Sequence, residues 1–335
     1  MIEKKFLPEE RIMNCLEANY GIKDAVLTHL PLGADMNALI YKAKASSKLS
    51  YFVKIKMGHH HDISIDIVEF LHNAGLKEII APVQTNQGHS TLLVDDFTVI
   101  VYPFIEGQDG FSRNLRHDQW VTLGKALRQI HEIDIPLSIQ NRLRRETYSP
   151  KWRKIVRSLY THATHPSGDE IAMKLWTFLK DNATTIHRLV DRADQLAQKL
   201  QTHSPLFVLC HSDIHGGNVL IDKDDSLYIV DWDEPMMAPK ERDLMFIGGG
   251  VANVWNKPDE EMLFYQGYGK IEVNRELLAY YRYERIVEDI ADYRQMLLMT
   301  TAGENRPILF KHFMDMFEPR GVVDIAFKTD DEMVS

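Results

Sequence analysis

The stretch from Val208 to Glu234, VLCHSDIHGGNVLIDKDDSLYIVDWDE, decides the fold of this chain. Its apolar runs at residues 206–210, 219–221 and 227–230 predict three short strands. A polar loop with two glycines separates the first two strands, and a polar turn separates the second from the third. The strand ends should therefore bring three oxygen-bearing side chains together, those of Asp213, Asn218 and Asp231.

These three residues supply the groups that phosphoryl transfer requires. Asn218 follows Asp213 by five residues, and Asp231 follows Asn218 by thirteen. Protein kinases have a catalytic Asp, an Asn and a metal-binding Asp in this order and at similar spacing. We therefore predict that Asp213 orients the acceptor hydroxyl as the catalytic residue. Asn218 and Asp231 are then expected to hold Mg²⁺, a hard cation that also binds the phosphates of ATP.

A metal site is the alternative interpretation of the same loop. His211, Asp213 and His215 stand two residues apart and could ligate a metal as in some hydrolases. That interpretation leaves Asn218 and the 231–233 segment without a role. The kinase interpretation uses all of them and is favoured.

The amino-acid composition is typical of a soluble globular enzyme. The chain has 335 residues, 44% hydrophobic and 26% charged, which suggests two lobes around well-buried cores. The net charge of −9 argues against nucleic acid as a partner and suits a cationic small molecule. Only two cysteines are present, with no apolar leader and no stretch that approaches a membrane span. A cytoplasmic protein with no membrane partner is expected, with a monomer as the default.

The loop HSDIHGGN at residues 211–218 resembles the aminoglycoside phosphotransferase family more than protein kinases, which carry Arg after the His. The usual family form is HGDxHPGN, so Ser212 and Gly216 are departures, but neither removes a chemical group. The resemblance implies an α+β, bilobal protein-kinase-like fold. A small antiparallel β-sheet lobe would span residues 1–102, a hinge residues 103–107, and a larger, mainly helical lobe residues 108–335. A helical acceptor-binding insertion is expected near residues 137–203.

The resemblance also implies an ATP-binding set in the first lobe. In the predicted strand YFVKIKM, Lys54 corresponds to the lysine that holds the α- and β-phosphates, with Lys56 as an alternative. Asp62 at the start of the next helix would pair with this lysine, with Asp66 as the alternative. The turn at residues 33–37 would cover the phosphates with its backbone, and the hinge would bind adenine. The residues concerned are Gly33, Asp35 and Asn37 in the turn, and the Pro103 carbonyl and Ile105 N–H in the hinge.

Further family positions support the loop and the acceptor. Asp243 would open a helix and brace the catalytic loop, while His211 and His215 would help to hold it. Acidic residues of the late helix, AYYRYERIVEDIADYRQMLL, would pair with ammonium groups of a cationic acceptor. The acceptor-pocket candidates are Asp233, Glu288, Asp289 and Asp292.

Longer segments resemble the spectinomycin branch of the family, among them YSPKWR, DWDEPMMAPKERDLMFIGGG and YYRYERIVEDIADY. The resemblance implies ATP-dependent O-phosphorylation of an aminocyclitol antibiotic, which confers resistance. A kinase of choline, homoserine or methylthioribose would preserve the same ATP-side residues and stays an alternative. A non-catalytic nucleotide-binding module is the alternative from another class.

Overall fold

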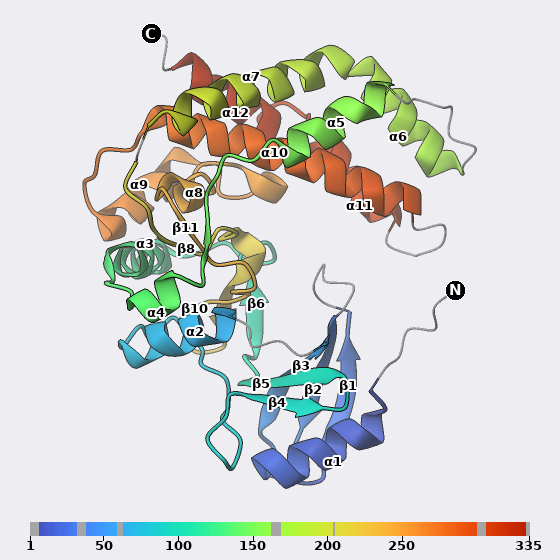
Figure 1. The fold of residues 1–335 in the computed structure, drawn as a ribbon, viewed down its shortest axis with the longest axis vertical. Coiled ribbons are helices and arrows are strands. Elements are labelled where there is room, and N and C mark those ends of the chain that lie inside the picture. Colours follow the sequence, from blue (N-terminus) through green and yellow to red (C-terminus); the bar gives the residue numbers. More distant parts are fainter. Residues whose placement is uncertain are drawn as a thin grey trace. The chain divides into compact units, whose positions relative to one another are not determined.

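The computed structural model describes residues 7–31, 38–58, 63–161, 169–203, 205–299 and 306–332 (Figure 1). Its contacts group the chain into two compact units. The first consists of Met1–Gln108 and Leu220–Asp233, and the second of Asp109–Val219 and Glu234–Ser335. The sequence-based division differs in two respects, because residues 103–108 and residues 220–233 both group with the first unit. An antiparallel sheet followed by a mostly helical remainder confirms the predicted α+β class.

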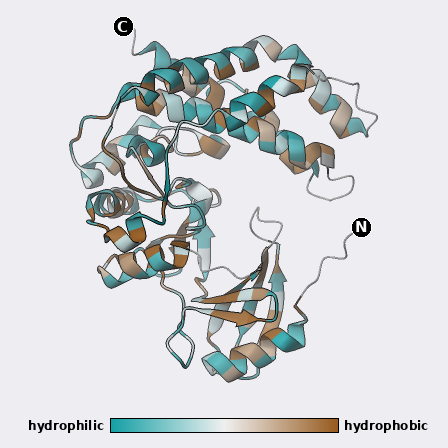
Figure 2. Cartoon of the chain, viewed as in Figure 1, coloured by the Kyte–Doolittle hydropathy of each residue, from teal (hydrophilic) through white to brown (hydrophobic). Residues whose placement is uncertain are grey.

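A five-stranded antiparallel sheet forms the centre of the first unit. Its order is β1-β2-β3-β5-β4. The strands are β1 (Val26–Leu30), β2 (Ala38–Lys44), β3 (Ser50–Met57), β4 (Thr91–Val94) and β5 (Phe97–Pro103). Strand β3 confirms the strand predicted for YFVKIKM. In Figure 2 these strands are largely brown, and their buried residues lie in β2, β3 and β5 at the centre of the sheet.

Helix α1 (Glu9–Tyr20) completes this core. Its apolar residues recur at helical spacing, and Ile12 and Leu16 are fully buried with Val53, Ile55 and other residues of the sheet. Gly21 ends the helix in a left-handed conformation with φ of 67°, which glycine adopts without strain. Because Val53 and Ile55 face this core, alternation turns Lys54 and Lys56 to the opposite face of β3.

The remaining elements of the first unit surround the segment that carries Asp231. They are α2 (Ile63–Asn73) and a small sheet of order β10-β9-β6, with β6 (Gly107–Asp109), β9 (Val219–Asp222) and β10 (Leu227–Ile229). Ile229 forms an isolated parallel bridge with Ile79, and its N–H donates to the Glu78 carbonyl at 2.8 Å. Trp232 is buried and its indole N–H donates to the Ile229 carbonyl at 3.2 Å. These bonds fix the chain on both sides of Asp231.

In the second unit, helices α3 (His117–Glu132) and α9 (Pro258–Tyr268) pack closely. Two glycines permit this approach, because a Cβ at Gly124 would lie 2.1 Å from the Phe264 carbonyl oxygen and one at Gly267 would lie 1.9 Å from that of Val121. A three-stranded sheet of order β7-β11-β8 adjoins them, with β7 (Arg144–Arg145), β8 (Val208–Cys210) and β11 (Met236–Ala238). Strand β8 leads into the loop of residues 211–218.

A long helix, α10 (Arg275–Met299), forms the centre of the rest of the second unit (Figure 1). Buried Arg153 of α5 joins three helices through ion pairs with Asp194 of α7, at 2.7 Å, and Glu284 of α10. The elements that contact α10 are α5 (Lys151–Thr161), α6 (Glu170–Asp181), α7 (Ala183–Gln201), α8 (Glu241–Leu244), α11 (Arg306–Asp315) and α12 (Val322–Asp331). The second unit also contains α4 (Leu137–Gln140) and short 3₁₀ turns at Gly216–Asn218 and Val251–Asn253. Among the described residues, no helix combines the length and hydropathy needed to cross a membrane.

Candidate active site

The loop of residues 211–218, which contains the predicted catalytic residue, has an unusual backbone conformation at Ser212. This residue has φ of 70°, in the left-handed region, and it stands where the usual family motif has glycine. The Ser212 hydroxyl donates to the Glu234 carbonyl at 2.6 Å, and its N–H donates to Asp243 at 2.7 Å. These two hydrogen bonds hold a serine in a conformation that glycine would adopt without cost.

Asp243 is the centre of the hydrogen bonds behind this loop. It is fully buried, and its carboxylate accepts hydrogen bonds from the backbone N–H groups of Ser212 and His211, the latter at 2.9 Å. The same carboxylate lies 3.0 Å from His131 Nε2 on α3. His131 in turn contacts the Tyr268 hydroxyl through Nδ1, at 2.7 Å. The sequence analysis did not identify His131 or Tyr268, because both lie at core positions of long helices.

The metal-site alternative fits the loop geometry poorly. The Asp213 N–H donates to His211 Nδ1 at 3.3 Å, and the Gly217 N–H donates to His215 Nδ1 at 3.1 Å. Within the part of the chain that the structure describes, possible metal-ligand atoms gather at His131, Cys210 and Asp243, and not at the histidines of the loop. The Asp243 oxygens of that buried group already accept backbone hydrogen bonds.

The two oxygens of the Asp213 carboxylate have different neighbours. Oδ1 accepts a hydrogen bond from Arg285 Nη1 of α10 at 2.5 Å, and Oδ2 lies 3.5 Å from His215 Nε2. The Asn218 amide nitrogen donates to the Asp213 backbone carbonyl at 2.8 Å, which leaves the amide oxygen of Asn218 available for another ligand. Burial by itself would raise the pKa of Asp213, but the positive Arg285 and the His215 contact outweigh it and hold that pKa well below its usual value.

Packing of Phe111 keeps His215 in place. The two rings stack with centroids 5.1 Å apart and an interplanar angle of 18°. Phe111 also covers the two glycines of the loop, because a Cβ at Gly216 or at Gly217 would lie 2.8 Å from its ring. The glycine at position 216, where the usual motif has proline, therefore makes room for this aromatic contact.

The predicted acceptor acids of α10 lie on one side of the helix with Arg285. Asp289 accepts a hydrogen bond from Arg285 Nε at 2.9 Å, and Glu288 and Asp292 are half-buried nearby along the helix. Burial raises the pKa values of Glu288, Asp289 and Asp292, and the positive charge of Arg285 opposes this effect at each of them. The sequence analysis missed Arg285, for which the motif gave no signal.

In the first unit, both candidate lysines contact the segment that follows β10. Lys54 Nζ lies 2.5 Å from Asp233 Oδ2 and 3.7 Å from Asp231 Oδ1. Lys56 Nζ lies 3.1 Å from Asp233 Oδ1. Burial would raise the pKa of Asp233, but the two lysines lower it. Asp231 has φ of 61° and keeps a partly exposed carboxylate, a combination of backbone strain and accessibility that is typical of functional sites.

The other predicted nucleotide residues are described only in part. Pro103 is the last residue of β5, Ile105 follows it half-buried, and Asp66 lies in the first turn of α2. Gly33, Asp35, Asn37 and Asp62 lie outside the described residues. Pairing of a lysine with Asp62 or Asp66 stays a prediction, whereas the structure places Asp233 between Lys54 and Lys56.

These contacts predict different effects for the two lysines. Because Lys54 reaches Asp231 as well as Asp233, we expect Lys54→Ala to raise the KM for ATP roughly tenfold or more, and Lys56→Ala to raise it less. Initial rates at varied MgATP concentration give the KM for ATP of each variant. Lys44→Ala, at the exposed end of β2, is the control. A larger effect of Lys56→Ala would assign the phosphate contact to Lys56 instead.

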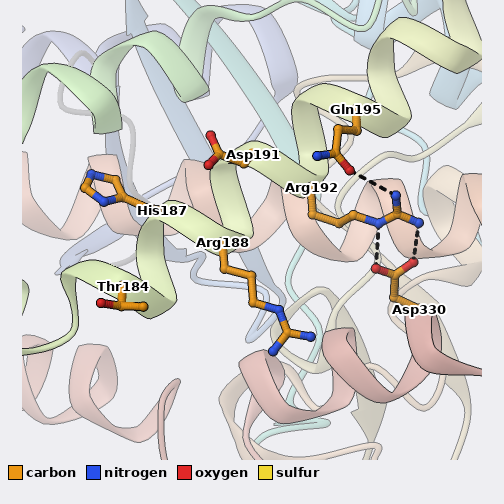
Figure 3. Close-up of a pocket in the computed structure, with 7 residues that line it drawn as sticks. All are labelled: Thr184, His187, Arg188, Asp191, Arg192, Gln195 and Asp330. Carbon is orange, nitrogen blue, oxygen red and sulfur yellow. Dashed lines mark hydrogen bonds and ion pairs between the residues drawn. The ribbon is translucent and has the colours of Figure 1, made fainter.

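A separate groove of about 520 Å³ lies on α7 and α12 (Figure 3). Its Arg192 is held in a bidentate ion pair by Asp330, at 2.6 and 2.8 Å, and also donates to Gln195. Its Arg188 lies over the ring of Phe327, 4.1 Å from the centroid. The groove contains none of the candidate site residues, and its charged groups are used in contacts between helices.

Comparisons with known proteins agree on one family. Residues 31–281 match the profile of the phosphotransferase enzyme family, APH. A crystal structure of spectinomycin phosphotransferase, APH(9)-Ia, in complex with ADP and spectinomycin is 49% identical. The match covers 96% of this chain and 98% of that one, with a TM-score of 0.89.

More distant structures share the fold alone. Amicoumacin kinase hAmiN is 17% identical over 96% of this chain and 97% of its own, with a TM-score of 0.64. A Plasmodium vivax ethanolamine kinase is 14% identical over 98% of this chain and 93% of its own, with a TM-score of 0.57. Comparison with curated protein sequences found no match. The fold, the loop of residues 211–218 and the family match together establish that this chain belongs to the phosphotransferase enzyme family and has its kinase-like fold.

Proposed function

We propose that this enzyme transfers the γ-phosphoryl group of ATP to a hydroxyl group of spectinomycin, and thereby confers resistance to it. The observation that carries the proposal is the 49% identity with a spectinomycin phosphotransferase over nearly the full length of both chains. We further propose that it acts as a monomer in the cytoplasm, where ATP is available. Its two cysteines are free and buried, which suits a reducing compartment.

In this proposal Asp213 orients the acceptor. Its carboxylate accepts a hydrogen bond from the reacting hydroxyl and aligns the oxygen with the γ-phosphorus, while the bond from that phosphorus to ADP breaks. Because the pKa of Asp213 is held low, its carboxylate is a weak base. Its contribution is therefore alignment of the nucleophile, which suffices for the loose transition state of phosphoryl transfer.

Asn218 and Asp231 are the residues that we propose as ligands of Mg²⁺. The donor set suits a hard cation, because Asp231 offers a partly exposed carboxylate and Asn218 has an amide oxygen left over after its nitrogen is hydrogen-bonded. Bound Mg²⁺ supplies positive charge that neutralises the phosphate oxygens. Lys54 is proposed to bind the phosphates, and the Pro103 carbonyl and Ile105 N–H are proposed to bind adenine.

Replacement of Asp231 tests the metal assignment. We expect Asp231→Asn to raise the Mg²⁺ concentration at half-maximal rate roughly tenfold or more, because a neutral amide is a weaker ligand than a carboxylate. Rates measured across a Mg²⁺ titration give this value. Asp224→Asn, in the exposed turn between β9 and β10, is the matched control. An unchanged Mg²⁺ titration in Asp231→Asn would remove Asp231 from the metal site.

The acids of α10 are proposed to bind the two secondary ammonium groups of spectinomycin. Because burial raises the pKa values of Glu288 and Asp292, these side chains take up protons at a higher pH than exposed acids. A protonated acid no longer attracts an ammonium group, so acidification should weaken acceptor binding. The acceptor amines stay protonated on acidification, which leaves the enzyme acids as the titrating groups.

We therefore expect the KM for spectinomycin to rise as the pH is lowered, with little change in the KM for ATP. Steady-state kinetics at a series of pH values measure this. The double variant Glu288→Gln, Asp292→Asn should show a high and nearly pH-independent acceptor KM. The control variant Glu272→Gln, at an exposed acid before α10, should behave like the wild type. A pH profile that persists in the double variant would exclude these acids as the cause.

Acceptor-dependent release of ADP tests the proposal as a whole. Purified enzyme with MgATP is assayed with spectinomycin, streptomycin, kanamycin or choline, and without acceptor. We expect stimulation by spectinomycin alone. Stimulation by another acceptor would keep the phosphotransferase assignment and contradict the proposed substrate.

A further inference from the structure

Because Arg285 contacts only one oxygen of the Asp213 carboxylate, the two oxygens have different hydrogen-bonding environments. Arg285 Nη1 donates to Oδ1 at 2.5 Å, so that oxygen already has a strong charge-assisted partner. Oδ2 has longer contacts, 3.5 Å from His215 Nε2 and 3.5 Å from the Asn218 amide nitrogen. The oxygen with the longer contacts is the better acceptor for an incoming hydroxyl group.

Arg285 is held in place from the other side. Its Nε donates to Asp289 Oδ1 at 2.9 Å, one helical turn further along α10. Its guanidinium group lies 5.6 Å from the centroid of the Phe246 ring, which suits a cation–π contact. Only 19% of its side chain is exposed. A cation fixed in this way presents its donor to Asp213 in one orientation.

A merely structural ion pair is the other interpretation of this contact. The backbone of the catalytic loop, however, is already held by Asp243, which accepts hydrogen bonds from the N–H groups of His211 and Ser212. The Ser212 hydroxyl adds a bond to the Glu234 carbonyl. Arg285 therefore acts on the side chain of Asp213 and not on the loop that carries it.

The positive charge of Arg285 affects where the ammonium groups of a cationic acceptor can bind. A carboxylate without a cationic partner attracts an ammonium group more strongly than a neutral hydroxyl, because the ammonium group adds the Coulomb attraction between two opposite charges to the hydrogen bond. Arg285 neutralises the carboxylate of Asp213 and repels a second cation. Glu288 and Asp292 make no hydrogen bond to Arg285 among the described residues, and they lie one turn apart on α10. An ammonium group would therefore bind beside these acids and leave Asp213 to the hydroxyl.

We propose that Arg285 is a positioning residue that sets the orientation of the acceptor. It reserves Asp213 Oδ2 for the reacting hydroxyl and excludes the acceptor ammonium groups from Asp213. This inference rests on the proposed function, because it requires an acceptor that carries both hydroxyl and ammonium groups.

Steady-state kinetics of three variants test the proposal: Arg285→Gln, Arg285→Lys and the control Arg294→Gln, on the same helix. Spectinomycin is varied at saturating MgATP, and MgATP at saturating spectinomycin. For Arg285→Gln we expect kcat to fall roughly tenfold to a hundredfold, since the hydroxyl is then misplaced. The KM for spectinomycin should stay unchanged or fall, because an ammonium group can now occupy Asp213 unproductively. The KM for ATP should not change.

The conservative variant separates charge from structure. Arg285→Lys keeps a cation and should recover at least part of the lost kcat, and Arg294→Gln should match the wild type. A kcat for Arg285→Gln within about threefold of the wild type would overturn the inference. Equal increases in both KM values together with a lower melting temperature would also overturn it, because they indicate a structural role. Absence of turnover by the wild type would instead overturn the proposed function, and the inference with it.

Discussion

Asp213→Ala should lower kcat by roughly two orders of magnitude or more, with little change in the KM for ATP. The expectation follows from the place of this carboxylate on the catalytic loop, with Oδ1 bound by Arg285 and Oδ2 open to an acceptor. Without the carboxylate, the reacting hydroxyl loses the group that aligns it with the γ-phosphorus. Binding of ATP depends on other residues and should persist.

The removal of Asp213 also leaves the guanidinium group of Arg285 with Asp289 as its hydrogen-bonded carboxylate. Asp213→Asn serves as the matched variant, because it keeps the shape of the side chain and an acceptor oxygen but removes the negative charge. Thermal unfolding of both variants establishes that they are folded before their kinetics are compared. Turnover close to that of the wild type in a folded Asp213→Ala enzyme would contradict the catalytic assignment.

Asp243→Ala should destabilise the folded state by about 3 to 5 kcal/mol, one of the largest effects expected for a single replacement in this chain. Its carboxylate is fully buried and accepts hydrogen bonds from two backbone N–H groups, and it also contacts His131. Alanine would remove, from a fully buried position, the carboxylate that accepts both N–H groups. Urea unfolding followed by circular dichroism measures the change in the free energy of unfolding.

Asp259→Ala is the control for this measurement, because Asp259 is an exposed acid in the first turn of α9. It should change the free energy of unfolding by no more than about 1 kcal/mol. Similar small effects for both variants would mean that the loop backbone does not depend on Asp243.

The elements that could be predicted from sequence are those whose pattern is local. Apolar runs at residues 206–210, 219–221 and 227–230 located β8, β9 and β10 to within about two residues. The loop of residues 211–218 was recognisable because its polar residues follow one another closely. Family resemblance then gave the α+β fold, which the family match confirms.

The contacts that sequence reasoning missed come from distant parts of the chain. Arg285 is 72 residues from Asp213, and no motif marks it among the many charged residues of α10. Lys54 and Lys56 were predicted as alternatives for one phosphate contact, with Asp62 or Asp66 as the paired acid. In the structure both lysines contact Asp233, which lies 177 residues after Lys56 in the sequence. Such pairs are set by tertiary packing, which a single sequence does not display.

Identification of the reaction product tests the central claim most directly. The enzyme is incubated with MgATP and spectinomycin, and the products are analysed by mass spectrometry and ³¹P NMR, with Asp213→Ala as the control. The account predicts spectinomycin that carries one phosphoryl group on an oxygen atom, formed together with an equal amount of ADP and absent from the control. Unmodified spectinomycin with ADP and free phosphate, or a product that carries a nucleotide, would contradict it.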